Sequence, residues 1–483
     1  MYKTLRSDVP PDKDYPARTY EIMWRERVRD GGLYDHLSVA FHDEKNSAGE
    51  YVQLRHRRPS VRYNLCRTVI DDSVSLLFSE GHFPVIRCKN KDTAEMFKRI
   101  IKERKLNELM IDAATKGSVG SVAILMQVFK GKPFFKALDT KYLTPHYDPT
   151  DPDRLVKVVE AYKVKRDQLI AVGITPPTGD SQFWWRVEWT ENAELHFVPQ
   201  TIEDAREGKQ PTASKDRSVE HKLGFCPLIW VKNLPGGDDI DGACTFPNEA
   251  VDTQIELEYQ LSQVGRGLKY SSDPTLLLKE PAVGEDGEVV KGAANAIVVS
   301  EKGDAKLLEI NGTAAEAVMK YVKLLREYGL ENLKGRSADP AKLSAARSAK
   351  AMELLNQPLI WLSDRLRISY GEGAFLAVMN LLIKASQKIA LKLNDTEAIG
   401  KLEAGPLTLH WPTWYAPTQE EKNTQATALK QLTDSNILSK ESATEIVGPV
   451  YDIEDTKTEL TRIEADRARL AAEQAKTQIA VQA

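Results

Sequence analysis

Cysteine is scarce in this chain of 483 residues, which holds only four: Cys66, Cys88, Cys226 and Cys244. No two of them lie closer than 18 positions, and there is no CxxC motif. Structural zinc sites need closely spaced cysteine or histidine pairs, and small secreted domains need many paired cysteines. We therefore expect neither a zinc site nor a disulfide framework, and we expect reduced thiols in a cytoplasm-like compartment.

Long hydrophobic runs are also missing. The longest apolar stretches, such as residues 374–383, have the length of a core helix, whereas a helix that spans a bilayer needs about 20 apolar residues. The N-terminal segment has no apolar region of the kind found in signal peptides. We therefore expect a soluble protein with no signal peptide and no membrane-spanning segment.

The chain has no excess of positive charge. Its 66 Lys and Arg residues face 70 Asp and Glu residues, which gives a net charge of −4. A protein that holds DNA by neutralising phosphates usually carries a clear basic excess, so tight non-specific DNA binding by a monomer is not expected. The composition, with 42% hydrophobic and 28% charged residues, is that of a globular protein, and the length fits about three domains.

Common catalytic motifs are absent as well. The chain has no GxxxxGK[ST] phosphate-binding loop, no GxSxG nucleophile motif and no HExxH metal motif. Residues 116–121 are rich in Gly and Ser but lack the Lys-Ser/Thr ending, and they predict the end of a helix followed by a strand. We expect no catalytic site, no cofactor and no enzyme activity, although scattered catalytic residues would escape such a search.

Possible metal ligands are poorly arranged. His36 and His42 lie among carboxylates, but a spacing of six residues fits neither a helix face nor a strand face. Two acidic loops carry several carboxylates but lack the DxDxDG spacing of calcium loops. Turns are the favoured interpretation, and cation binding that depends on assembly stays open. The two loops contain Asp148, Asp151 and Asp153, and Asp238, Asp239 and Asp241.

Basic and aromatic residues form small clusters. Residues 42–62 hold a basic group that could face phosphate or a partner, although a solvated loop with salt bridges is favoured. The aromatic clusters predict packing in a core or interface rather than stacking on single-stranded nucleic acid. The basic group is Arg55, His56, Arg57, Arg58 and Arg62; the aromatic clusters are Phe183, Trp184, Trp185 and Trp189, and Trp411, Trp414 and Tyr415.

The first half of the chain predicts an α+β fold. Its apolar residues follow helical spacing in some segments and strand spacing in others. Residues 144–154 predict a Pro/Asp loop, and 203–221 an exposed insertion. Helices are expected at 17–29, 63–80 and 92–116, with an N-cap at Asp92 or Thr93, and strands at 84–88, 122–128, 133–138, 156–164, 184–189, 196–199 and 226–231.

In the second half, two predicted helices, 247–268 and 313–328, enclose a small β module. Its strands are expected at 275–279, 296–300 and 306–310, with turns at 285–287 and 302–304, and Gly329 is expected to end the second helix. The two helices would lie side by side with the β module at one end.

A charged loop, 331–343, follows these helices. Residues 344–393 then show a helical pattern roughly 70 Å long, which Pro358 should kink. A helix of this length indicates a scaffold that crosses between domains or subunits. The remaining predicted elements are a strand at 407–411 and helices at 417–434, 440–447 and 452–477, the last of them polar nearly all round.

This order of elements resembles the portal proteins of tailed double-stranded DNA bacteriophages. The resemblance begins near residue 60 and covers some four-fifths of the chain, while residues 1–60 and 203–221 match less clearly. It depends on the order of segments, because the family has no invariant motif. The segments are Arg62-Tyr63-Asn64, Leu77 to Gly81, Tyr147-Asp148-Pro149, Leu223 to Ile229 with Asn233, Ile437 to Glu441, Asp452, Glu454 and the final Glu/Arg-rich helix.

The resemblance implies a portal fold of several parts assembled as a ring, typically of twelve copies. The parts would be a wing, a helical stem, a small α/β clip, a tunnel loop, a long kinked wing helix and a helical crown. Carried onto this sequence, the wing is 1–243 and 344–417, stem helix 1 is 244–272, the clip 273–312, stem helix 2 313–330, the tunnel loop 331–343 and the crown 418–483.

The implied function is a channel at one capsid vertex, through which genomic DNA is packaged and ejected. The implied partners are the terminase large subunit, the head–tail adaptor, the major capsid and scaffold proteins, and the DNA itself. The protein would be assembled in the host cytoplasm and located in the virion. Lys334, Arg336 and Lys342 are the candidate residues of the tunnel loop that contact DNA. The alternatives are another virion assembly protein, such as an adaptor or scaffold, and an enzyme of unrecognised type.

Overall fold

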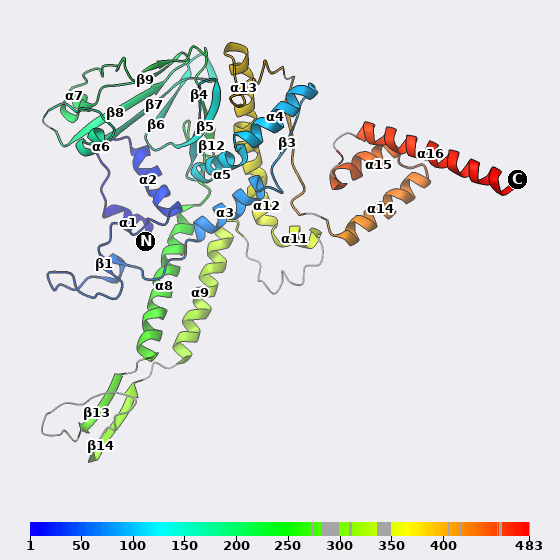
Figure 1. Cartoon of the computed structure of the whole chain (residues 1–483). Helices are drawn as coiled ribbons and strands as arrows, with labels where there is room; N and C mark the ends of the chain where they lie inside the picture. The colour runs from blue at the N-terminus through cyan, green and yellow to red at the C-terminus, as the bar shows by residue number, and fades with distance from the viewer. Residues whose placement is uncertain are drawn as a thin grey trace.

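A computed structural model describes most of the chain and shows an α/β body from which two helices project (Figure 1). The C-terminal helices extend from the body on another side (Figure 1). The described residues are 1–178, 180–272, 275–281, 299–308, 312–335, 349–403, 405–415, 417–451, 453 and 456–482.

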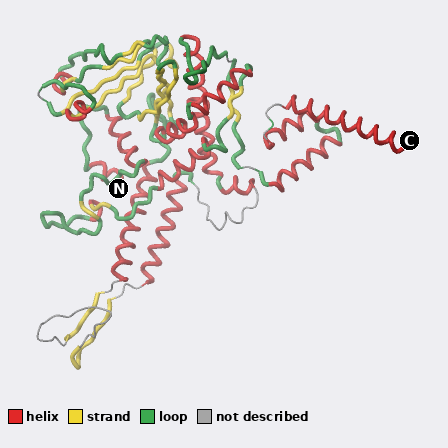
Figure 2. Tube along the Cα trace, in the orientation of Figure 1, coloured by secondary structure: helices red, strands yellow, loops and turns green. Residues whose placement is uncertain are grey.

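Two antiparallel sheets form the β part of the body (Figure 2). One has the strand order β12-β4-β5, and the other the order β11-β9-β8-β7-β6, with β10 also paired to β8. The central strand β4 is buried along most of its length, which explains its nearly unbroken apolar sequence. The strands are β4 (Ser121–Phe129), β5 (Lys132–Asp139), β6 (Leu143–Asp148), β7 (Asp151–Lys165), β8 (Gln182–Trp189), β9 (Ala193–His196), β10 (Gln200–Thr201), β11 (Val219–Glu220) and β12 (Leu228–Lys232).

The expected loop at 144–154 is wrong, because β6 and β7 form a hairpin there. Pro145 lies within β6, where a missing N–H is tolerated because β6 is an edge strand. The segment 203–221 is largely exposed, as expected, but it contributes the short helix α7 (Ile202–Arg206) and strand β11 to the sheet. Two further small sheets pair β1 (Val39–Ala40) with β2 (Arg57–Arg58), and β3 (Val85–Arg87) with β15 (Thr408–His410).

The helix expected at 92–116 is two helices, α4 and α5. The chain turns between them at Lys105, which has a φ of 49° without being a glycine. The N-cap is Asn90 rather than Asp92 or Thr93, since its side chain accepts hydrogen bonds from the backbone of both. The helices of the first half are α1 (Tyr2–Ser7), α2 (Ala17–Arg29), α3 (Leu65–Phe78), α4 (Lys91–Glu103), α5 (Leu106–Gly117) and α6 (Arg166–Ala171), with a short 3-10 turn at Leu54–His56.

The two projecting helices are α8 (Asn248–Ser272) and α9 (Gly312–Asn332), called here the arm. Beyond them lies an antiparallel hairpin of β13 (Thr275–Pro281) and β14 (Val299–Leu308). The expected turn at 302–304 is wrong, because β14 runs through it. Gly329 does not end α9, which continues to Asn332; a Cβ at Gly329 would lie 2.8 Å from Leu65 Cδ1, so glycine permits close packing on α3. The expected turn at 285–287 lies outside the described residues.

The long helical segment is interrupted where Pro358 predicts a kink. Asn356 separates α11 (Ala349–Leu355) from α12 (Gln357–Leu366), and Pro358 occupies the first turn of α12. A π-helix, Arg367–Phe375, then joins α12 to α13 (Leu376–Lys388). The segment ends at Lys388 instead of the expected residue 393. Its start at 344–348 lies outside the described residues.

The segment Gln357–Lys388 is the one described helix that is long and apolar enough to cross a membrane by length and composition. Half of its most apolar window is buried inside the protein. Phe375, Val378 and Leu382 from this segment belong to the main hydrophobic core, together with Phe78 of α3 and Phe97 of α4. These contacts account for its apolar sequence as that of a core helix.

Three helices at the C-terminus match the expected positions closely. They are α14 (Gln419–Asp434), α15 (Lys440–Val447) and α16 (Thr456–Gln482), with a 3-10 turn at Gly448–Tyr451. Thr418 and Glu421 form a reciprocal capping box at the start of α14. The side chains of α16 that the structure describes are mostly exposed, in keeping with its polar sequence.

Replacing Asn90 tests the position of the N-cap of α4. Asn90→Ala removes the acceptor for the N–H groups of Asp92 and Thr93, so unfolding should become easier by about 1 kcal/mol in urea titrations. Glu95→Ala, at an exposed position of the same helix, is the control and should change stability by less than about 0.5 kcal/mol. Equal effects of the two changes would contradict this assignment.

Candidate functional site

The root of the arm is buried in the body. Glu258 of α8 is 1% exposed, and its carboxylate accepts hydrogen bonds from the Tyr34 hydroxyl at 2.6 Å and from the Tyr63 N–H at 2.9 Å. Burial raises the pKa of Glu258, while these donors oppose that effect. Because both donors are also held in the body, α8 has a fixed starting direction.

The basic segment near residue 55 is part of this support. The Tyr259 hydroxyl donates to the backbone carbonyls of Arg55 and Arg57, and the Arg57 side chain is buried and donates to Val52 O. Arg266, farther along α8, forms a 2.6 Å ion pair with Glu44. The favoured interpretation of this segment as a salt-bridged loop therefore holds in part, but Arg57 has a structural role inside the protein.

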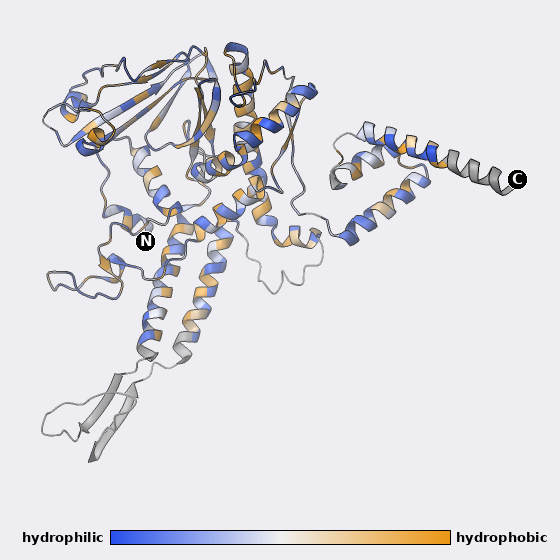
Figure 3. Ribbon diagram, viewed as in Figure 1, coloured by the Kyte–Doolittle hydropathy of each residue, from blue (hydrophilic) through white to orange (hydrophobic). Residues whose placement is uncertain are grey.

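The arm has exposed apolar side chains on two opposite sides of α9. With about 100° of rotation per residue, Val322 and Leu325 face α8, whereas Met319 lies on one flank of the pair, near Leu268 of α8. The other flank of α9 is made by three further residues. They are Tyr321, Leu324 and Tyr328, which are 40–53% exposed. Hydrophobic residues occur along both arm helices (Figure 3).

The chain leaves α9 through a tight turn at Lys334. Lys334 has a φ of 55°, its N–H donates to Glu331 O at 3.0 Å, and the Gly335 N–H donates to Leu330 O at 2.7 Å. This pair of bonds is the Schellman arrangement that closes a helix C-terminus. Lys334 is exposed, whereas Gly335 is buried against Val69 of α3. The two other residues expected to contact DNA in the tunnel loop, Arg336 and Lys342, lie outside the described residues.

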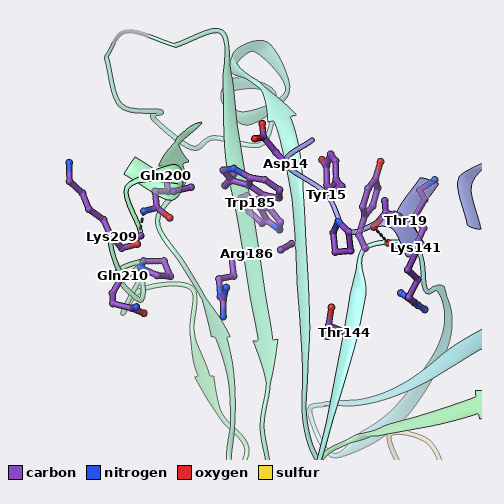
Figure 4. Close-up of a pocket in the computed structure, with 18 of the residues that line it drawn as sticks. Asp14, Tyr15, Thr19, Lys141, Thr144, Trp185, Arg186, Gln200, Lys209 and Gln210 are labelled. Atoms are coloured by element: carbon purple, nitrogen blue, oxygen red, sulfur yellow. Dashed lines mark hydrogen bonds between the residues drawn. The ribbon is translucent and has the colours of Figure 1, made fainter. Parts of the chain in front are cut away.

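A pocket of about 540 Å³ lies between the larger sheet and the N-terminal segment (Figure 4). Trp185 and Arg186 of β8 lie at its centre, with Tyr15 and Thr19 on one side and Gln200 on the other (Figure 4). The charged side chains of its lining all take part in ion pairs. The pairs are Asp14 with Lys163 and Arg206, Arg18 with Asp241, Lys141 with Glu26, Arg186 with Glu188, and Lys209 with Asp204. The pairs of Asp14 join the N-terminal segment to β7 and α7, whereas those of Arg186 and Lys209 are local.

The acidic groups lie at the tight turn between β6 and β7 and in the turn before Gly242, and several of their carboxylates accept hydrogen bonds from neighbouring residues. Asp148 accepts hydrogen bonds from Thr150, and Asp238 from the N–H groups of Ile240 and Asp241. Asp241 pairs with Arg18. In the part of the chain that the structure describes, no three His, Cys, Asp or Glu residues are grouped so that they could hold a metal ion.

The aromatic clusters are packing elements, as expected. Phe183 is fully buried, Trp184 contacts Tyr15 edge-on, and Trp185 lies under the Arg217 guanidinium. Trp411 and Trp414 both stack against the guanidinium of Arg367, in the π-helix. Burial lowers the pKa of Arg367 to about 10, although the charge of the Asp364 carboxylate opposes this effect. The sequence contains no signal for this contact, because Arg367 lies more than 40 positions from both tryptophans.

Substituting Gly335 tests the packed end of α9. A Cβ there would lie 2.5 Å from Val69 Cγ2, so Gly335→Ala should lower the free energy of unfolding by about 1–3 kcal/mol in urea titrations. Gly265→Ala on α8 is the matched control, because nothing lies within 4 Å of its Cβ position. That change should stabilise the helix by up to about 1 kcal/mol. A stabilised Gly335→Ala variant would be inconsistent with a packed turn.

The contact between Asp14 and the sheet predicts a pH dependence. Hydrogen bonds from Arg206 and Lys163 lower the pKa of Asp14 to about 2 from an ordinary value of 3.8. Its contribution to stability is therefore complete above pH 4 and is lost as the pH falls toward 2. In thermal unfolding, Asp14→Asn should reduce the fall in melting temperature between pH 4 and pH 2. Asp153→Asn, at an exposed position, should leave that fall unchanged.

Comparison with known families identifies a family to which this chain is similar over most of its length. The model of the family described as "Phage portal protein, SPP1 Gp6-like" matches residues 40–475, nearly the whole sequence. A search of curated proteins gives no match.

Proposed function

The chain belongs to the SPP1 Gp6-like family of phage portal proteins, and we propose that twelve copies of it form a ring around a channel for double-stranded DNA. As a phage portal protein it is a virion component that acts in DNA packaging and assembly, and its family is structural rather than enzymatic.

The main support for a ring is the pair of apolar surfaces on opposite sides of the arm. A closed ring needs a heterologous interface, in which one surface of a subunit meets a different surface of the next. The flank with Met319 and Leu268 and the flank with Leu324 and Tyr328 are two such surfaces on opposite sides of the same helix pair. Arms standing side by side would cover both of them in every subunit.

The long helical segment offers a second contact surface. Leu354, Trp361 and Ile368 recur every seven residues and are 60–63% exposed. They lie on three successive parts of this segment, which are α11, α12 and the π-helix, and each part contributes one large apolar side chain to its surface. A large exposed tryptophan in such a row indicates a protein interface. We propose that the neighbouring subunit covers this row.

The proposed parts follow the order of elements along the chain. The arm supplies the stem (244–272 and 313–330), and the hairpin beyond it belongs to the clip (273–312), which would meet the terminase large subunit and later the head–tail adaptor. The body is the wing (1–243 and 344–417), and α14–α16 form the crown (418–483). The hairpin of β13 and β14 lies beyond the arm, away from the body (Figure 1), which supports the proposal that the clip is the docking surface for other proteins. The major capsid and scaffold proteins would surround the ring, which is assembled in the host cytoplasm.

The nearly balanced charge of the arm is compatible with a channel through which DNA slides. Between its two apolar flanks, the outer side of α9 carries acidic and basic residues in similar numbers: Glu316, Lys320, Lys323, Glu327 and Glu331. Many phosphate contacts would hold DNA in place, whereas a nearly neutral wall lets it pass. The proposed tunnel loop, 331–343, adds a few cations: Lys334 is exposed at the start of this loop, and Arg336 and Lys342 follow it in sequence.

Charged substitutions on the arm test the ring. Twelve copies of a 54.1 kDa chain amount to about 650 kDa, a mass that mass photometry can detect, and negative-stain images should show annular particles. Leu324→Glu with Tyr328→Glu should abolish this species, because it places charge in the proposed interface. Glu327→Gln, on the outer side of α9, should leave it intact. A wild-type protein that forms a closed dimer at every concentration and salt would contradict the ring.

Charge reversal in the tunnel loop tests DNA contact. Lys334→Glu with Arg336→Glu should leave the 650 kDa ring intact but reduce DNA packaging or retention in an in vivo complementation assay, because phosphates would meet carboxylates. Lys350→Glu, on α11 outside this loop, is the control and should package DNA normally. Normal packaging by the double variant would contradict the proposed contact of Lys334 and Arg336 with DNA.

A further inference from the structure

The side chain of Asn233, directly after β12, joins two parts of the chain that are far apart in sequence. It is fully buried, and its Nδ2 donates hydrogen bonds to Ala243 O and Thr245 Oγ1, both at 2.9 Å. Its Oδ1 accepts a hydrogen bond from the Tyr370 hydroxyl, also at 2.9 Å. Ala243 and Thr245 lie in the segment that leads into α8, whereas Tyr370 lies in the π-helix.

The segment that leads into α8 is held by the turn between α5 and β4 as well as by Asn233. The Gly242 N–H donates to Gly120 O at 2.9 Å, and the Thr245 N–H donates to Ser118 O at 2.8 Å. The Asn233 N–H also donates to Gly120 O, at 2.9 Å. The backbone and the side chain of Asn233 therefore share this one turn with the start of the arm.

The π-helix is closely surrounded where Tyr370 leaves it. A Cβ at Gly117 would fall on the Tyr370 hydroxyl, and a Cβ at Gly371 would lie 2.5 Å from Trp411 Cζ2. A π-helix holds one more residue per turn than the α-helix it interrupts. A return to α-helical geometry would rotate the residues on one side of it by about 100°. That rotation would carry the Tyr370 hydroxyl away from Asn233.

We infer that Asn233 couples the register of the long helical segment to the position of the arm, with Tyr370 and Thr245 as its two positioning contacts. The Asn amide is planar, so its oxygen and its nitrogen move as one unit. If the Tyr370 hydroxyl moves away, the buried Oδ1 of Asn233 loses its hydrogen-bond donor. The orientation of the amide that bonds Ala243 and Thr245 is then less stable. The inference concerns the single chain and stands whether or not the proposed ring forms.

Hydrogen exchange measured by mass spectrometry tests this coupling in the full-length protein. Tyr370→Phe keeps the ring of the side chain and removes only the hydroxyl. It should speed exchange of the Gly242, Ala243 and Thr245 amides about tenfold, although none of these residues touches Tyr370 in the bonds described above. Because coupling is reciprocal, Thr245→Val should speed exchange across 371–376 by a similar factor.

Two comparisons make the result decisive. Tyr20→Phe removes a hydroxyl that donates to Arg6 O, a contact that involves neither Asn233 nor its partners, and should change neither region. Amides of β7 and β8 should exchange at the wild-type rate in every variant. If Tyr370→Phe speeds exchange only within 367–376, or equally throughout the chain, the inference is wrong. Should Tyr370→Phe fail to fold, Thr245→Val alone tests the coupling. Faster exchange across 371–376 in that variant is expected only if the two contacts are coupled.

Discussion

The arm can exist only because polar groups at its root are buried with their hydrogen bonds made. A helix that starts inside a body and ends outside it must bury one half and expose the other. In α8 the buried half contains Gln254, Glu258 and Ser262, and each of them is bonded to the body or along the helix. A buried carboxylate or amide without hydrogen bonds would lower the free energy of unfolding by a large fraction of a domain's total stability. The direction of the arm, and with it the spacing of any neighbouring arms, depends on these bonds.

The sequence predicted the elements whose signals are local. Helix 17–29, the β4–β5 hairpin, the two arm helices and the break near Pro358 have clear periodicity or strong breakers. The failures have local causes too. Lys105 adopts a left-handed conformation without being a glycine, so the break between α4 and α5 left no signal. Pro145 made a strand resemble a loop, and the Gly303 region made one strand resemble two.

The candidate site was predictable only in outline. The sequence marked Lys334 as exposed, charged and next to a helix end, and the structure shows all three properties. It gave no indication of the Schellman turn, since the left-handed residue is a lysine and the buried glycine follows it. The contacts of Asn233 and Arg367 join residues 10 to 137 positions apart, and a single sequence contains no information on such pairs.

The continuity of α8 has a mechanical consequence. Its 25 residues form one uninterrupted helix, about 37 Å long, that begins among the core residues of the body and ends beside the hairpin. A push or pull along the helix axis at the outer end is therefore passed inward through a single column of backbone hydrogen bonds, with no intervening loop to absorb it. The inner end of that column is the segment beside Asn233, so strain applied at the tip would be delivered to the centre of the protein.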